Sequence, residues 1–303
     1  MPLPDAPATT ARPVDAVALA RWRRRLRDAP EPPWLHAEAA RRMADRLGVV
    51  RLQPERIVSW GLQPMLDQSL LAAAYPKARV WSVDPDGLAR PATLAPWWRS
   101  LWPRTAPVES FAPDTVPPGQ AQLVWSVMSL HTAVDPQAAF VAWHRALAVD
   151  GFLMFCTVGP GTLSSLAHRW AGQGFGPALA PLVDMHDLGD MLVQAGFADP
   201  VMDQETLRLT WDSAGAALAE LRSLGLNATP ARHAGLRTPR WREQLPQALE
   251  TLRGPDGRIV LEFELVYGHA FKPLPRARVA SETTVALDDL RTMARRPGTT
   301  PRR

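Results

Sequence analysis

The chain has 303 residues, and its 34 Lys and Arg residues against 30 Asp and Glu residues give a formal net charge of +4. Eight basic and three acidic residues lie between Lys272 and Arg303, so the remaining sequence is close to neutral, which argues against a basic groove for nucleic acid. The single cysteine, Cys156, excludes an intramolecular disulfide, and no apolar run reaches the roughly 18 residues that a membrane-spanning helix needs.

The N-terminal segment, residues 1–32, is expected to lie outside the main domain. Residues 1–13 lack the apolar core of a signal peptide and predict a disordered segment, which favours a cytoplasmic protein. The sequence from Val14 to Arg27 predicts a basic helix, which we expect to form a solvated lid or arm; a phosphate-binding surface is the alternative. Pro32-Pro33 begins a second helix, which ends at Gly48.

Between residues 56 and 158, short apolar segments alternate with helical ones. The predicted strands cover 56–60, 79–83, 121–125 and 151–158, and the predicted helices cover 64–74 and 135–148. The Pro-rich stretch at 85–118 predicts loops. Such alternation is typical of a parallel, doubly wound α/β sheet, in which ligands bind at the carboxyl ends of the strands.

The sequence after Val158 predicts further helices and two long strands. The helices are expected at 163–170, 184–195, 212–224 and 240–253, and the strands at 199–210 and 258–267. We expect the last strand to be antiparallel and to lie at the edge of the sheet. The predicted organisation is one domain over 33–273, with helical insertions at about 160–182 and 212–253, followed by a basic flexible tail at 274–303.

Asp84 is the strongest cofactor signal in the residues themselves. It follows the second predicted strand, where an acidic residue can accept hydrogen bonds from both ribose hydroxyls. A turn residue before Pro85 is the alternative. The loop after the first strand, residues 59–65, holds one glycine, Gly61, and by itself predicts no nucleotide. No P-loop, zinc-protease or hydrolase motif occurs, so we expect no metal.

A second polar cluster lies on the predicted helix at 184–195. His186 and Asp190 are four residues apart, which places them on one face. They could form a polar patch that faces a ligand. An ordinary surface helix with Asp184 as its N-cap is the alternative.

The sequence over about residues 34–273 resembles the BioC malonyl-carrier-protein O-methyltransferases, specifically from residue 151 onward and weakly before residue 130. The resemblance rests on the segments 155–163, 183–197, 199–203, 205–210 and 262–270. It implies a Rossmann-like class I methyltransferase fold, with a mostly parallel doubly wound sheet, an antiparallel last strand and extra helices. It also implies S-adenosylmethionine (SAM)-dependent O-methylation of the free carboxylate of malonyl-acyl carrier protein in the early, pimelate stage of biotin biosynthesis.

The resemblance implies four cofactor-binding positions: Ser59, Gly61, Asp84 and Ser126. Asp84 matches the acid that binds the ribose in this family. The first loop of the family reads Asp-x-Gly-x-Gly-x-Gly, whereas the corresponding positions here are Ser59, Gly61, Gln63 and Met65. The acid that would hold the methionine amino group is therefore missing, and Gln63 or Met65 could clash with the cofactor.

Methylation of a carboxylate needs no general base, because the carboxylate is already ionised at pH 7, so no catalytic residue is predicted. A mild substrate clamp is expected from His186, Tyr267 or His269, with strand packing as the alternative for the last two. The arginines at positions 23 to 25 are expected to dock the acidic carrier protein: Arg23, Arg24 and Arg25. We expect a monomer with no nucleic-acid or membrane partner.

Three functions stay open. The first is an active methyltransferase of the BioC type, which Asp84 and the C-terminal half favour. The second is a catalytically degenerate methyltransferase-like protein retained for binding or regulation, which the altered loop at 59–65 favours. The third is a different reaction on the same fold.

Overall fold

The computed structural model describes residues 11–88, 109–225, 227–232 and 238–275. One compact unit ends at Pro273, and a second begins at Leu274. The first ten residues of the predicted disordered segment, and the predicted tail from residue 276 onward, lie outside the described residues.

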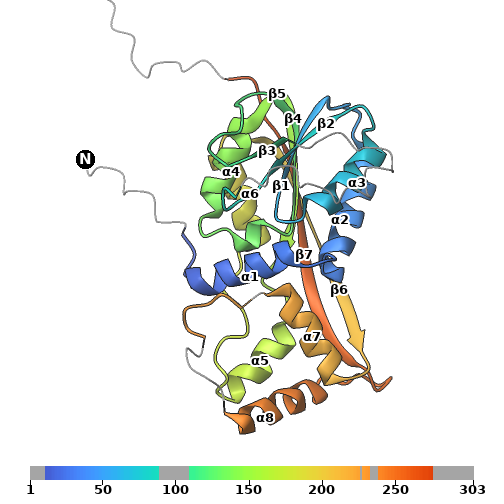
Figure 1. Ribbon diagram of the computed structural model, residues 1–303, viewed down its shortest axis with the longest axis vertical. Coiled ribbons are helices and arrows are strands. Elements are labelled where there is room, and N and C mark those ends of the chain that lie inside the picture. Colours follow the sequence, from blue (N-terminus) through green and yellow to red (C-terminus); the bar gives the residue numbers. More distant parts are fainter. Residues whose placement is uncertain (1–10, 89–108, 226, 233–237, 276–303) are drawn as a thin grey trace, which may run out of the picture. The chain divides into compact units, whose positions relative to one another are not determined.

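A seven-stranded sheet with the order β3-β2-β1-β4-β5-β7-β6 forms the centre of the first unit (Figure 1). Its strands are β1 (Arg56–Trp60), β2 (Arg79–Val83), β3 (Glu109–Phe111), β4 (Ala121–Val127), β5 (Leu147–Val158), β6 (Ala198–Trp211) and β7 (Ile259–Phe271). The first five strands pair in parallel, and β7 is antiparallel to both β5 and β6. The prediction of a mostly parallel sheet with an antiparallel last strand is confirmed.

Helices cover both faces of the sheet. α2 (Trp34–Arg46), which leads into a short 3-10 turn at Leu47–Val49, and α3 (Pro64–Ala74) pack on one face. α4 (Pro136–Ala146), which follows a 3-10 turn at Leu130–Thr132, and α6 (Met185–Gln194) pack on the other. The interior strand β5 is buried on both faces from Gly151 to Val158, as expected for a strand between two helical layers. The thiol of Cys156 is fully buried in this strand.

The remaining helices are α1 (Ala16–Asp28), α5 (Ser164–Gly172), α7 (Ala214–Leu224) and α8 (Pro239–Glu250). α5 contacts β7, α7 contacts β6, and α8 contacts both α5 and α7. Within the described residues, no helix is long and apolar enough to cross a membrane.

Two predictions about the sheet are wrong. The last strand, β7, does not lie at the edge, because β6 pairs with it from Trp211 opposite Ile259 to Ala198 opposite Phe271. Apolar residues alternate with polar ones in the first half of β7 because only one face of that half is fully buried, where helices such as α5 contact it. The alternation does not indicate an edge strand. The short strand β3 lies in the stretch at 85–118 for which loops are expected, and its three residues are too few to give a pattern.

Candidate active site

The carboxyl ends of β1, β2 and β4 meet at one edge of the sheet. Ser59 of β1 lies between Ser82 of β2 and Trp125 of β4 in the strand register. The backbone N–H of Gly61 donates to the carbonyl of Val83 at 3.0 Å, so the loop after β1 is tied to the end of β2. The structure therefore brings Ser59 and Gly61 to the residue that follows Val83, which is Asp84.

Asp84 is bound by an arginine of the N-terminal helix. Arg27 Nε donates to Asp84 Oδ2 at 2.9 Å, and Arg27 Nη2 donates to Asp84 Oδ1 at 3.2 Å. Arg27 also pairs with Asp86 at 2.5 Å, and Arg23 pairs with the same carboxylate. The side chains of Arg27 and Asp84 are 10% and 15% exposed, so this ion pair is largely shielded from water. The Asp84 carboxylate also accepts a hydrogen bond from the backbone N–H of Asp86, as a turn residue does.

α1 lies over the loop that follows β1. Its buried residues Leu19, Trp22 and Leu26 form one apolar cluster with Leu62 of the loop and with Ala228. The expectation of a solvated arm is wrong, because an apolar stripe at positions i, i+3 and i+7 buries one face of the helix. Trp22 completes this stripe, and the five arginines around it conceal the apolar spacing in the sequence.

Contacts before α1 and at its start hold the helix in place. The buried Arg12 guanidinium donates to the carbonyls of Pro181, at 2.9 Å from Nε, and of His131. Asp15 caps the helix by accepting hydrogen bonds from two backbone N–H groups of the first turn, and it also pairs with Arg232. The described part of the N-terminal segment is therefore bound to three separate loops.

Asp67 is a buried acid that the sequence interpretation missed. Ser59 Oγ donates to Asp67 Oδ2 at 2.7 Å, and Trp125 Nε1 donates to Asp67 Oδ1 at 3.0 Å. The residue is 3% exposed, and burial raises the pKa of its carboxyl to about 6. An acid in the first turn of a helix ordinarily lies on the surface and interacts favourably with the helix dipole. The sequence position of Asp67 therefore does not indicate a buried acid. The available signal was a single acid in the first turn of the predicted helix, eight positions after Ser59.

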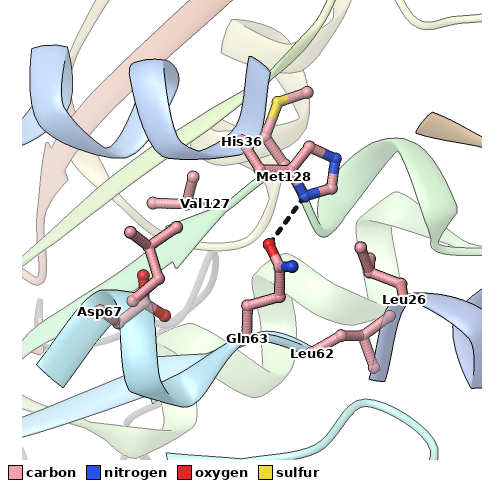
Figure 2. Close-up of a pocket in the computed structure, with 8 residues that line it drawn as sticks. Leu26, His36, Leu62, Gln63, Asp67, Val127 and Met128 are labelled. Carbon is pink, nitrogen blue, oxygen red and sulfur yellow. Dashed lines mark hydrogen bonds between the residues drawn. The ribbon is translucent and has the colours of Figure 1, made fainter. Parts of the chain in front are cut away.

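Gln63 and Met65, which stand where the BioC family has glycine, differ in their exposure and contacts. Gln63 points inward, and the Nδ1–H of His36 in α2 donates to its Oε1 at 3.0 Å, so that Gln63 reaches across the pocket (Figure 2). His36 is fully buried, and burial lowers its pKa to about 4, which keeps it neutral at pH 7. Met65 is 73% exposed and does not line the pocket.

A small pocket lies between His36, Gln63 and Asp67. Its volume is about 10 Å³, the space of about one water molecule. Its lining consists of Leu26, His36, Leu62, Gln63, Leu66, Asp67, Val127 and Met128. Met128 has a φ of 49° and donates its backbone N–H to the carbonyl of Cys156. The pocket therefore draws on α1, α2, the loop after β1, α3 and the end of β4.

Ser126 lies next to this pocket but points elsewhere. It is fully buried, and its Oγ lies 2.5 Å from Oγ of Ser129. The neighbouring Val127 and Met128 provide the contact of β4 with the pocket.

The three expected substrate residues lie on α6 and β7. His186 is exposed near the start of α6, where its backbone N–H donates to Asp184. The Tyr267 ring packs under the Arg46 guanidinium at 3.7 Å, and its hydroxyl donates to Glu205. These contacts between described residues tie Tyr267 to α2 and β6, not to Ser59, Gly61 or Asp84.

His269 packs among aromatic side chains. Its ring centroid lies 4.8 Å from that of Phe271 and 6.2 Å from that of Phe152. Burial lowers its pKa, so the ring is neutral at pH 7. Its Nε2 is buried with no hydrogen-bond partner among the described residues. The contacts of Tyr267 and His269 with the described residues are packing contacts within the fold, and their role as a substrate clamp stays a prediction.

Comparisons with known proteins identify the family. The malonyl-[acyl-carrier protein] O-methyltransferase of Gallionella capsiferriformans is 38% identical over 251 residues, covering 80% of this chain and 85% of that protein. The protein of the same name from Laribacter hongkongensis is 38% identical over 252 residues, covering 80% and 84%. No family model matches the chain.

A solved structure supports the fold. The YcgJ protein of Bacillus subtilis superposes with a TM-score of 0.52 at 11% identity, covering 77% of this chain and 98% of that one. Together with the strand order, this agrees with the Rossmann-like class I methyltransferase fold that the resemblance implies. The chain belongs to the malonyl-[acyl-carrier protein] O-methyltransferase family.

Proposed function

We propose that this protein transfers a methyl group from SAM to the free carboxylate of malonyl-acyl carrier protein, the early step of biotin biosynthesis. The observation that carries the proposal is Asp84, which stands directly after β2 beside the loop of Gly61. The relatives with this name, at 38% identity over most of the chain, support the choice of substrate.

The donor set at this edge of the sheet fits SAM. Asp84 would hold the ribose hydroxyls, and Gly61, which has no side chain, would let the backbone approach the ligand. Met65 is no obstacle, because it is exposed and does not line the pocket. When bound, SAM supplies an electrophilic methyl group on its sulfonium.

The protein's own contribution is binding, positioning and the exclusion of water. α1 closes the site with Leu26 against Leu62, and Arg27 occupies Asp84. A pocket of about 10 Å³ does not admit the cofactor, so we infer that Arg27 and the Gln63 side chain move when it binds. The substrate carboxylate is ionised at pH 7, so no proton has to be removed.

Isothermal titration with S-adenosylhomocysteine, followed by transfer of labelled methyl from SAM to malonyl-acyl carrier protein, tests the proposal. We expect wild-type protein to bind and to transfer, and Asp84→Asn to bind at least about tenfold more weakly, because a charge-assisted hydrogen bond is lost. Labelled ester on malonyl-carrier protein but not on the unloaded carrier would support the substrate.

A degenerate, non-catalytic protein is the second candidate. The observation that favours it is the closed pocket, with Asp84 already paired to Arg27. Thermal unfolding with S-adenosylhomocysteine separates the two, since the ligand at a concentration of about 100 times its Kd would stabilise the fold by about 2.7 kcal/mol. A protein whose unfolding temperature does not change at millimolar S-adenosylhomocysteine would contradict the enzyme.

A further inference from the structure

We propose that the carboxylate of Asp67, on α3, binds the ammonium group of the methionine part of SAM, in place of the acid that the end of β1 lacks. This inference rests on the proposed function and names a binding residue that the loop sequence does not reveal. It explains how the site could keep its cofactor after an acid was replaced by Ser59.

The position of Asp67 supports the substitution. Its carboxylate is one hydrogen bond from the Ser59 hydroxyl, at 2.7 Å, and therefore lies beside the position where the family's acid would stand. A Cβ added to Gly61 would lie 4.0 Å from Asp67 Oδ2, so the carboxylate also lies beside the single glycine of the loop. Asp67 lines the pocket together with Gln63 (Figure 2).

The charge of Asp67 is not balanced by the protein. Among the described residues, no Lys, Arg or His forms an ion pair with it; its two hydrogen bonds come from Ser59 and Trp125. A carboxylate has about four acceptor sites, so capacity remains for a further donor. A buried charge without a counter-ion is costly, and an ammonium group from a ligand would remove that cost.

A purely structural role is the competing explanation. Asp67 joins α3 to β1 and β4 through its two hydrogen bonds. An asparagine has the same shape and can still accept a hydrogen bond through its oxygen, so Asp67→Asn would preserve much of such a link without the buried charge. The two roles therefore differ in whether the negative charge matters to the ligand.

The affinities of two ligands that differ only in the amino group test whether the negative charge of Asp67 matters. The probes are S-adenosylhomocysteine and its analogue in which hydrogen replaces the amino group, each titrated into wild type and Asp67→Asn by calorimetry. We expect wild type to prefer S-adenosylhomocysteine by at least about tenfold and Asp67→Asn to lose that preference, while its affinity for the analogue stays within about threefold of wild type. A structural role would change both affinities together.

Moving the acid back to β1 is the matched control. The double variant Ser59→Asp with Asp67→Asn exchanges the positions of the acid and the neutral partner, and we expect it to regain the preference for S-adenosylhomocysteine. The wild type alone is also informative, since it needs no mutant to fold. The inference is overturned by a wild-type protein that does not distinguish the two ligands, or by an Asp67→Asn variant that distinguishes them equally well. A wild-type protein that binds neither ligand overturns the proposed function as well.

Discussion

Arg27 of α1 holds the carboxylate of Asp84, at the end of β2, with hydrogen bonds of 2.9 Å and 3.2 Å. One helix outside the sheet thus occupies the acid that would bind the ribose of the cofactor. Opening of α1 and binding of the cofactor are coupled in this arrangement, because the same carboxylate serves both.

Replacing Arg27 by Gln should therefore raise the affinity for S-adenosylhomocysteine several-fold, since Asp84 becomes free. The same change should lower the free energy of unfolding of the free protein by about 1 to 2 kcal/mol, because a shielded ion pair is lost. Calorimetry and urea unfolding measure the two effects. Arg24→Gln is the control, since Arg24 is exposed on the same helix and pairs only loosely with Asp28, at 3.7 Å. A weaker affinity in Arg27→Gln would show that Arg27 assists the bound state instead.

Asp67→Asn should be at least as stable as wild type at pH 7. Burial raises the pKa of Asp67 from 3.8 to about 6, so the folded protein binds this proton more tightly than the unfolded chain. The ionised form consequently costs stability, with a penalty that is absent below pH 3.8 and reaches about 3 kcal/mol above pH 6.

Asp67→Asn removes this penalty but weakens the two hydrogen bonds to the side chain. We therefore expect the free energy of unfolding of the variant to exceed that of wild type by about 1 to 2 kcal/mol at pH 7. The advantage should shrink as the pH falls from 6 to 4, which urea unfolding at several pH values measures. His36, the other titratable group that lines the pocket, is common to both proteins, so its own protonation cancels in the difference. A variant that is less stable by the same amount at every pH would contradict the prediction.

Gly225 fixes the position of α1 through a close approach. Its φ is +59°, and a Cβ there would come within 1.4 Å of the Trp22 ring. Gly225→Ala should therefore displace α1 and accelerate hydrogen exchange in the helix, in addition to the strain of about 1 kcal/mol that a side chain meets in this conformation.

Gly257→Ala separates the two effects. Gly257 also has a positive φ, +74°, but nothing lies within 4 Å of an added Cβ. It should show a similar loss of stability from backbone strain and no faster exchange in α1. Equal rates of hydrogen exchange in α1 of the two variants would show that the packing of Trp22 does not require a glycine at position 225.

The sequence was sufficient for the elements that have a clear local pattern. Residues 56–60, 64–74 and 79–83 form β1, α3 and β2 with the predicted limits, because apolar runs and a proline at a helix start determine them locally. The sheet order next to β7 was not accessible, since pairing with β6 depends on contacts across the fold.

The site was only partly predictable for the same reason. The gathering of Ser59, Gly61 and Asp84 follows from the rule that parallel strands end at one edge. The approach of Asp67 to Ser59 does not, because it depends on how α3 packs against β1 and β4. The pairing of Arg27 with Asp84 joins residues 57 positions apart, and no local pattern indicates it.

The exposed arginines of α1 are the part of this helix available to a partner. Arg23 is bound to Asp86 and to the Thr132 carbonyl at 2.7 Å, so it faces the protein rather than the solvent. The exposed set is Arg21, Arg24 and Arg25. We therefore change the docking prediction to these three residues, which lie on one face at spacings of three and four.

Reversing the three charges, Arg21→Glu, Arg24→Glu and Arg25→Glu together, should weaken binding of the acidic carrier protein by at least about tenfold at low salt, because opposite charges attract it and like charges repel it. The loss should diminish at about 1 M salt, where screening is strong. Surface plasmon resonance with malonyl-carrier protein measures both. The control variant reverses Arg51, Lys77 and Arg79, which are exposed near the amino ends of β1 and β2 and carry the same total charge. Equal weakening in the two variants would mean that net charge, and not the surface of α1, attracts the carrier.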